Sequence, residues 1–279
     1  MKGHFKFLIS LFYLIVIAIK SLLLRILLGR SDCKLLTLNY HSIPNDQKAN
    51  FIWQLKILRK IGEIVPIDFT VKNTKTKRFF KITFDDGFES IINNAVPYLE
   101  SNNIPYAVFI PTAYMGKVAK WQHYNGKNNP DETIINKNQI LKLNKDLAII
   151  GSHSAHHLKF TTIPYDQRLI ELKESKEVLE DLLNIEIPFL SIPYGEYDNK
   201  LVELARNVGY SKIYSSEPEF TYNNSGNDNF LNGRVSVCPD DSRIKFIIKI
   251  LGGYNWSSKY FRLKRKIKPV LSKKSERKA

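Results

Sequence analysis

The chain has 279 residues, of which 43% are hydrophobic and 25% charged, an ordinary composition for a globular protein that buries a sizeable core. Its formal net charge is +15, but residues 1–30 carry +5, residues 259–279 carry +9, and residues 31–258 carry only +1. A nucleic-acid-binding protein would need a basic body, so this distribution argues against that class. The two cysteines, Cys33 and Cys238, imply no disulfide framework and offer no metal–thiolate set.

Residues 1–30 are predicted to form a hydrophobic membrane anchor. The uncharged run from Phe7 to Ile19 has 13 residues, and it approaches the roughly 20 needed to cross a bilayer only if Lys20 and Arg25 extend toward lipid head groups. A cleaved signal peptide is the alternative, but no small-residue cleavage site follows the run. We therefore expect an uncleaved anchor that either spans the membrane or lies in its interface, on a side that the sequence leaves open.

Residues 31–258 are predicted to form one α/β domain with mostly parallel strands, because short apolar runs alternate with helical patterns. The predicted strands are 35–40, 79–84, 106–110, 147–151, 189–192, 212–215 and 234–237. The predicted helices include 51–61, 90–102, 166–183, 199–209 and 242–251. A long loop is expected at 116–133. Residues 259–279 are expected to be a basic tail, either an electrostatic membrane contact or a solvated extension.

Polar residues follow four of these strands. His41 follows the first strand, and Asp85 and Asp86 follow the second. His153 follows the run 147–151, and the turn Pro193-Tyr194-Gly195 follows the run 189–192. Since the carboxyl ends of parallel strands share one face of an α/β fold, we expect these four positions to converge on one site.

The residue types in this set favour metal chemistry. His153 and His157 are four residues apart, and on a helical turn that spacing would point both imidazoles from one face, although a capped helix start would show the same pattern. Asp85-Asp86-Gly87 alone predicts an Asp-Gly turn, or a phosphoacceptor Asp, which would give the histidines no role. Two histidines and one aspartate form a facial ligand set that leaves positions open for water and substrate.

In chain order, TFDDG, His-Ser-x-x-His and a strand ending in Pro-Tyr-Gly resemble the polysaccharide deacetylase family, the NodB-homology carbohydrate esterases of family 4. The segment LNYHSIPND resembles the poly-N-acetylglucosamine deacetylase-like branch, and the resemblance covers roughly residues 35–237. It implies a distorted (β/α)7 barrel. It also implies a metal-dependent hydrolase that removes N-acetyl groups from N-acetylhexosamine units of a cell-surface polysaccharide or its lipid-linked precursor. The implied metal is zinc, with cobalt, nickel or manganese as alternatives.

The resemblance implies roles for the motif residues. Asp85 is the expected general base. Asp86, His153 and His157 are the expected metal ligands. The backbone N–H of Tyr194 is the expected donor to the tetrahedral oxyanion, which the metal would share.

Two departures from the family pattern direct attention to other residues. Ser191 occupies the place of the family arginine that orients the base, so Arg234 is the candidate replacement, with a surface arginine as the alternative. No histidine follows His157, so the usual late general acid is absent. His41 is the candidate acid, and a buried structural histidine is the alternative.

The sequence is also compatible with other functions, and it offers candidate residues for sugar binding. The chain is alternatively a deacylase for formyl or O-acetyl groups on a lipid-linked sugar, or a carbohydrate-binding homologue without activity. Aromatic side chains after strands are candidates for walls on which a sugar ring stacks, and plain packing is the alternative. These candidates are Tyr106, Trp121, Tyr194 and Tyr197.

Overall fold

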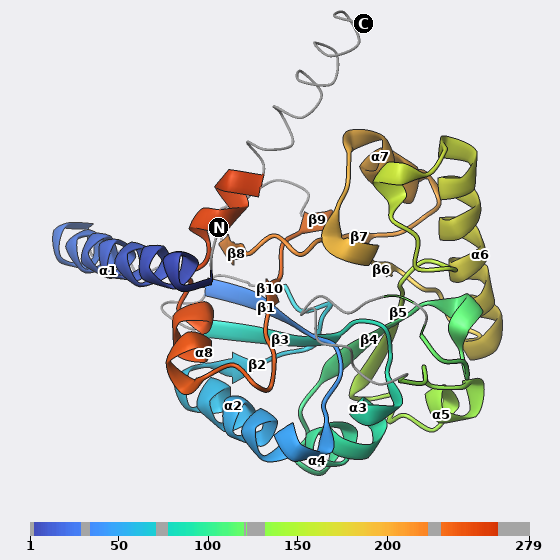
Figure 1. Ribbon diagram of the computed structural model, residues 1–279, viewed down its shortest axis with the longest axis horizontal. Coiled ribbons are helices and arrows are strands. Elements are labelled where there is room, and N and C mark those ends of the chain that lie inside the picture. Colours follow the sequence, from blue (N-terminus) through green and yellow to red (C-terminus); the bar gives the residue numbers. More distant parts are fainter. Residues whose placement is uncertain are drawn as a thin grey trace, which may run out of the picture.

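The computed structural model describes residues 3–28, 34–70, 78–119, 121, 132–222 and 230–261 (Figure 1). Its centre is a curled, mainly parallel sheet with the strand order β10-β1-β3-β4-β5-β6-β7-β9. These strands are β1 (Lys34–Tyr40), β3 (Arg78–Phe84), β4 (Tyr106–Ile110), β5 (Ala148–Ser152), β6 (Phe189–Ser191), β7 (Lys212–Tyr214), β9 (Leu231–Asn232) and β10 (Val235–Ser236). The short strands β2 (Glu63–Ile64) and β8 (Phe220–Tyr222) pair with β3 and β1 outside this order.

A single segment, residues 231–236, closes the barrel. β9 pairs with β7 at one edge of the sheet and β10 pairs with β1 at the other, and only Gly233 and Arg234 separate the two strands. A Cβ at Gly233 would lie 2.2 Å from the backbone oxygen of Glu217, so this bend needs a residue without a side chain. The two short strands therefore act as a seventh barrel strand, and the predicted distorted (β/α)7 architecture is confirmed.

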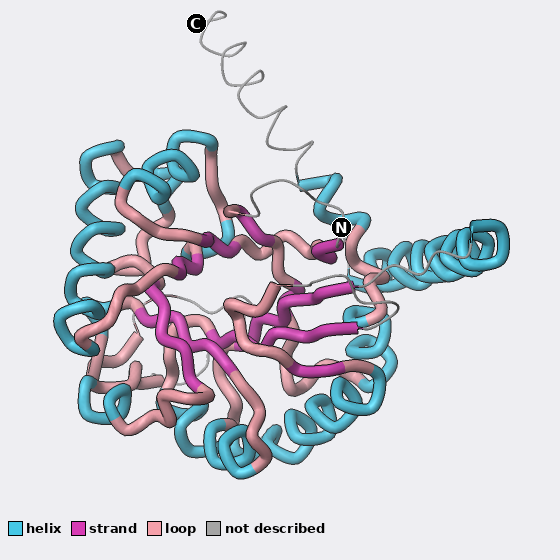
Figure 2. The backbone as a smooth tube through the Cα atoms, turned by 180° about the vertical axis from the view of Figure 1, so that it is seen from behind, coloured by secondary structure: helices cyan, strands magenta, loops and turns pink. Residues whose placement is uncertain are grey.

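Helices surround the curled sheet on its outside (Figure 2). They are α2 (Lys48–Ile61), α3 (Glu89–Asn94), α4 (Val96–Ser101), α5 (Lys137–Leu141), α6 (Tyr165–Leu183), α7 (Asn199–Asn207) and α8 (Arg243–Ile250). The helix predicted at 90–102 is in fact two helices, α3 and α4, separated at Ala95. Pro97 lies in the first turn of α4 and has no N–H with which to continue the hydrogen bonds of α3.

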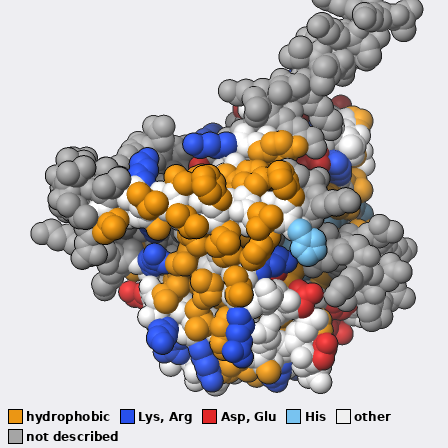
Figure 3. Space-filling view, turned by 60° about the vertical axis from the view of Figure 1, so that its left-hand side comes forward, with side chains coloured by type: hydrophobic (Ala, Val, Ile, Leu, Met, Phe, Trp, Pro, Cys, Tyr) orange, Lys and Arg blue, Asp and Glu red, His pale blue; other side chains and the backbone are white. Residues whose placement is uncertain are grey.

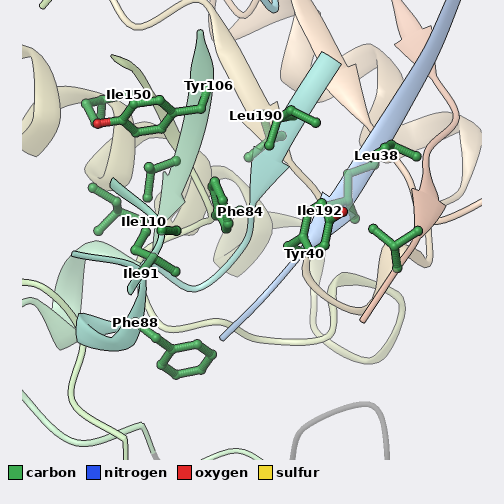
Figure 4. Close-up of a cluster of buried hydrophobic side chains, with 14 of the residues drawn as sticks. Leu38, Tyr40, Phe84, Phe88, Ile91, Tyr106, Ile110, Ile150, Leu190 and Ile192 are labelled. Atoms are coloured by element: carbon green, nitrogen blue, oxygen red, sulfur yellow. The ribbon is translucent and has the colours of Figure 1, made fainter. Parts of the chain in front are cut away.

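The two faces of the strands have different surroundings. Outward side chains such as Leu38, Tyr40, Phe84 and Leu190 belong to the main buried apolar cluster beneath the helices (Figure 4). Inward side chains form a second apolar cluster of Ile67, Ala107, Phe109, Phe189 and Tyr214. Toward the carboxyl ends, the buried side chains change to Asn39, Thr83, Ser191 and Arg234. The barrel thus presents buried polar groups at the end where the site was expected.

The N-terminal segment forms helix α1 (Gly3–Leu28), which contacts α8. Its 19-residue stretch His4–Leu22 is long and apolar enough to cross a membrane, by length and composition. Both membrane anchors and signal sequences have this property. Most of the predicted loop at 116–133, and residues 262–279 of the predicted tail, lie outside the described residues.

Candidate active site

The structure brings the predicted site residues together at the carboxyl ends of the strands. Asp85 and Asp86 follow β3, His153 follows β5, and Tyr194 lies in the turn Pro193–Gly195 after β6. His41 follows β1 and is close enough to both carboxylates for its charge to lower their pKa values. The predicted convergence of four strand ends is therefore observed.

Asp86, His153 and His157 form a buried donor set. Their ligand atoms all lie within 4.8 Å of one another, and Asp86 Oδ1 is 3.2 Å from His157 Nε2 and 3.6 Å from His153 Nε2. Among the described residues, Asp86 Oδ1 has no hydrogen-bond partner despite its burial. His153 Nδ1 bonds the carbonyl oxygen of Ser191 at 2.8 Å, which makes Nδ1 the protonated nitrogen and leaves the Nε2 lone pair directed toward Asp86. Two imidazoles and an unsatisfied carboxylate oxygen fit a divalent cation such as zinc.

A strained loop, and not a helical turn, brings the two histidines together. Ser154 and His157 have φ values of 61° and 54°, which no right-handed helical turn contains, so the predicted helical turn is wrong. The Ser154 hydroxyl accepts the His157 backbone N–H at 3.0 Å, which holds this loop closed. Asp86 and Tyr194 also have positive φ, at 66° and 60°, so four of the six non-glycine residues with positive φ in the described chain lie here. Such backbone strain clusters at functional sites.

Arg234 and Asp85 form a buried bidentate ion pair. Arg234 Nη1 donates to Asp85 Oδ1 at 2.8 Å and Nη2 donates to Oδ2 at 2.7 Å. Arg234 Nη2 also donates to the Ser191 hydroxyl at 2.7 Å, and Asn39 Nδ2 donates to Asp85 Oδ2 at 2.9 Å. The arginine is fully buried, so the surface-arginine alternative is wrong. A guanidinium from the closing segment reaches Asp85 past the small side chain at position 191.

The surroundings set the charges of the site. Burial opposes ionisation of Asp85, but the Arg234 guanidinium holds its pKa well below the usual range. Burial also opposes ionisation of Asp86, and the adjacent His157 nevertheless brings that pKa to about 2. Burial lowers the pKa of His153 to about 4, which keeps the imidazole neutral at physiological pH, as a metal ligand requires.

Aromatic side chains line the histidine side of the site. Trp121 stacks on the His157 ring with centroids 4.2 Å apart and an interplanar angle of 14°. Tyr194 meets His157 edge-on at 4.9 Å and is 46% exposed, so its ring is available to a ligand. Tyr106 and Tyr197 are buried and hydrogen-bonded in the core, and the prediction that they form sugar-stacking walls is wrong.

Three residues at the site were missed by the sequence analysis. Asn39 and Thr83 contact the guanidinium of Arg234 through their side-chain oxygens, at 3.3 and 3.2 Å. Strand alternation could have identified Thr83. It precedes Asp85 by two residues, so the two side chains point to the same face of the sheet. Glu171 on α6 is buried and binds both the backbone N–H and Nδ1 of His156, at 2.7 and 2.8 Å, which fixes the histidine loop.

Comparison with known proteins places this site in a family. The family model for polysaccharide deacetylase matches residues 72–213, about half of the chain and the part that carries Asp85, Asp86, His153 and His157. YxkH of Bacillus subtilis (strain 168), a polysaccharide deacetylase homologue, is 24% identical over 196 residues, which are 66% of this chain and 65% of that protein. The match thus spans slightly less than two thirds of this relative's length.

Solved structures agree on the fold. IcaB from Ammonifex degensii superposes with a TM-score of 0.66 at 19% identity, covering 81% of this chain and 98% of that one. The Streptococcus pyogenes deacetylase PplD, solved with acetate, gives 0.64 at 16% identity, covering 79% and 99%. The predicted NodB-homology fold is confirmed. The family model matches across all three motifs and the barrel has the expected architecture, and the chain belongs to the polysaccharide deacetylase family.

Proposed function

We propose that this protein is a metal-dependent hydrolase that removes N-acetyl groups from N-acetylhexosamine units of a polysaccharide. The observation that carries this proposal is the Asp85–Arg234 ion pair directly beside the donor set of Asp86, His153 and His157. Family membership supports an acetylated polysaccharide as the substrate. Those three donors would hold the divalent cation, with zinc the leading candidate, and the bound cation would polarise the acetamide carbonyl and activate water.

Asp85 is suited to accept the proton of the attacking water. Its Oδ2 accepts hydrogen bonds from Arg234 and Asn39, whereas Oδ1 accepts one from Arg234. Because a carboxylate oxygen has two lone pairs, Oδ1 keeps one lone pair for the proton. Arg234 keeps Asp85 ionised and fixes the plane of its carboxylate, so the base is ready and oriented before substrate binds.

Tyr194 and His41 supply the other two functions. The Tyr194 backbone N–H donates to the oxyanion that develops when water adds to the acetyl carbon. His41, close to both carboxylates, gives a proton to the sugar nitrogen as the carbon–nitrogen bond breaks. The products are acetate and a free amine on the sugar.

The test is acetate release from N-acetylglucosamine oligomers by the detergent-solubilised full chain, with zinc or cobalt or after chelation. We expect metal-dependent release that Asp85→Asn abolishes and that His41→Ala lowers about 10²-fold or more with bound metal unchanged. Asp166→Asn, which changes an exposed aspartate on α6, is the matched control and should retain activity. A folded, metal-loaded protein that releases no acetate would contradict the proposal and direct attention to formyl or O-acetyl substrates, or to a binding protein without activity.

A further inference from the structure

Helix α1 docks on the barrel through a serine in the middle of its apolar run. Ser10 is fully buried, and its hydroxyl accepts the indole N–H of Trp256 at 2.9 Å. The Tyr254 side chain also lies near Ser10. A Cβ at Gly253 would lie 2.9 Å from the Ser10 carbonyl oxygen and 2.4 Å from Ile248 Cγ2. The backbone of α1 therefore comes as close to the body as a glycine permits, and the one serine of this run is hydrogen-bonded to the folded domain.

The docked side of α1 is a narrow stripe. At 3.6 residues per turn, the partly buried Phe7, Tyr13, Leu14 and Ile17 lie on the same side as Ser10. Large apolar side chains that are exposed occupy an arc of about 140° on the opposite side. These side chains, here called the α1 apolar face, are Phe5, Leu8, Leu11, Phe12, Ile15, Val16, Ile19 and Leu22.

The cations of α1 separate from this face. At the same helical periodicity, Lys6 and Lys20 both fall outside the arc of the α1 apolar face. A helix that lies in the plane of a membrane interface shows this division, with one apolar face and cations away from it. A spanning helix needs apolar surface wherever lipid surrounds it.

The docking contact also argues against a spanning orientation. Ser10 is four residues into the 13-residue uncharged run, so in a spanning helix it would lie below the head groups. The loop that carries Trp256 would then lie at the same depth, and Asn255 Oδ1, which is buried and has no hydrogen-bond partner among the described residues, would find none in hydrocarbon. The uncharged run itself extends about 20 Å, and only the longer stretch His4–Leu22, which includes Lys6 and Lys20, approaches the roughly 30 Å of the hydrocarbon core.

The surroundings of α1 match an anionic bilayer. Apolar side chains, those of α1 among them, gather in a broad patch on the side of the molecule where α1 lies, with Lys and Arg side chains beside it (Figure 3). Lys259 is exposed only three residues after Trp256, so the chain enters its basic C-terminal part close to α1. Residues 259–279 contain ten Lys or Arg and one Glu, and residues 3–28 contain no acidic residue. Clustered cations beside an apolar face bind anionic head groups.

We propose that α1 is a permanent interfacial anchor that lies along an anionic bilayer, with the α1 apolar face at the boundary between head groups and acyl chains. The barrel stays attached to the opposite side of the helix through Ser10, Gly253 and Trp256. The proposal concerns the position of α1 and is independent of the proposed catalytic function.

Depth measurements on the full chain test this orientation. Spin labels are attached to Leu8→Cys, Ile15→Cys and Leu22→Cys in a background in which both native cysteines are serine, in vesicles of phosphatidylglycerol and phosphatidylcholine. We expect the three labels at one common depth, about 5–10 Å below the head groups. A label on Lys173→Cys, exposed on α6, should remain in water.

Three results would overturn the proposal. A label at Ile15 much deeper than those at Leu8 and Leu22 would show a spanning helix. Labels that are shielded without lipid and that broaden one another's spectra would show that a second copy covers the α1 apolar face. A membrane-extracted protein whose intact mass lacks the residues of α1 would show a cleaved leader.

A conservative variant tests the docking contact itself. Trp256→Phe keeps an aromatic ring of smaller size and removes the N–H that Ser10 accepts, so a label at Leu8 should become more mobile while the barrel stays folded. Trp53→Phe, at an indole that packs edge-on against Phe246, is the matched control and should leave that label unchanged. Unchanged mobility in Trp256→Phe would show that the Ser10 contact does not hold α1.

Discussion

Replacing Arg234 by serine is expected to disable the candidate base while leaving the donor set in place. The guanidinium makes two charge-assisted hydrogen bonds to Asp85, at 2.8 and 2.7 Å, and both side chains are buried. Breaking a buried ion pair by removing one partner costs about 3–5 kcal/mol of stability. Loss of an oriented general base lowers kcat/KM by about 10²–10⁴. The variant should therefore be measurably destabilised and nearly inactive, with its bound metal retained.

Replacing Arg234 should shift the pH dependence of kcat/KM in a defined direction. Arg234 lowers the pKa of Asp85 against the opposing effect of burial, so removing the guanidinium must raise that pKa. As the proposed base, Asp85 can accept a proton only when it is ionised, so the acidic limb of the kcat/KM profile should move to higher pH in Arg234→Ser. The stabilisation from this ion pair is present above the ordinary aspartate pKa and is lost as the pH falls through the lower folded-state value.

An exchange of the two side chains is the sharper test. The Ser191 hydroxyl is 2.7 Å from Arg234 Nη2, so an arginine at position 191 can bring its guanidinium to the same carboxylate. The double variant Ser191→Arg/Arg234→Ser should recover at least about tenfold of the activity lost in Arg234→Ser. Ser191→Arg alone should be destabilised, because it places two guanidinium groups in one buried space.

The assay is acetate release across pH, with urea unfolding and metal content measured on each variant. In an Asp85→Asn background, Arg234→Ser should cost no further activity, because the arginine acts through that carboxylate. Arg206→Ser, at an exposed arginine that stacks on Phe230, is the control and should change activity less than about twofold. Two results would show that Arg234 does not act through Asp85. One is an additive loss of activity when Arg234→Ser is combined with Asp85→Asn, and the other is a folded Arg234→Ser protein with the wild-type pH profile.

Three further predictions follow from individual contacts. Chelation should abolish acetate release and zinc should restore it, whereas His157→Ala should bind less than stoichiometric metal by elemental analysis and stay inactive when zinc is added. Burial lowers the pKa of Lys81 from 10.5 to about 7 in the folded protein. Between pH 7 and 10.5 the lysine is therefore protonated in the unfolded chain and largely neutral in the folded one, so the free energy of unfolding should rise with pH over this range. Lys81→Met should remove that slope in urea unfolding and raise stability at pH 7 by less than the full pKa shift implies, because it also removes the hydrogen bond from Lys81 Nζ to the Ile67 carbonyl at 2.6 Å; the exposed Lys173→Met should change stability by less than ~0.5 kcal/mol. In Gly233→Ala the new methyl group would collide with the backbone oxygen of Glu217 and displace the neighbouring Arg234. The variant should lose ~1–3 kcal/mol of stability and have a lower kcat, and an unchanged kcat would contradict the role given to residues 231–236 in closing the barrel.

The barrel strands were predictable because their apolar runs are short and alternate with segments of helical pattern. The predicted run 106–110 coincides with β4, and the run 79–84 lies one residue inside β3. The site end was predictable for a related reason, since polar residues that directly follow parallel strands must meet at one edge of the sheet. Spacing alone did not predict the short strands β2, β8 and β9, which are two or three residues long and depend on their partners for pairing.

Two features of the site required three-dimensional information. The histidine pair depends on positive φ at Ser154 and His157, which residue spacing does not encode, and so the helical interpretation was wrong. Arg234 was a candidate from the sequence, but its contact with Asp85 depends on residues 231–236 bridging opposite edges of the sheet. Such a long-range closure has no local sequence signal.

The anchor and the candidate site lie at different ends of the barrel, and this bears on the substrate. α1 leaves the molecule on the side where β1 and β3 begin (Figure 1), whereas His41 and Asp85 follow the far ends of those strands. Seven residues of β1 at about 3.3 Å each place the site roughly 20 Å from the end at which α1 joins. With α1 in the interface, a sugar at the head-group level would lie far from this site, whereas a polymer extends to it.

We therefore expect a higher kcat/KM for soluble N-acetylglucosamine oligomers than for a lipid-linked N-acetylhexosamine presented in the same vesicles. Both substrates are compared with the full chain bound to anionic vesicles, so that the orientation of α1 is the same in each assay. Triton-dispersed lipid-linked substrate is the control, because it can approach the site from any direction and should be turned over faster than in vesicles. Preference for the vesicle-embedded sugar would show that the site faces the membrane and would contradict this arrangement.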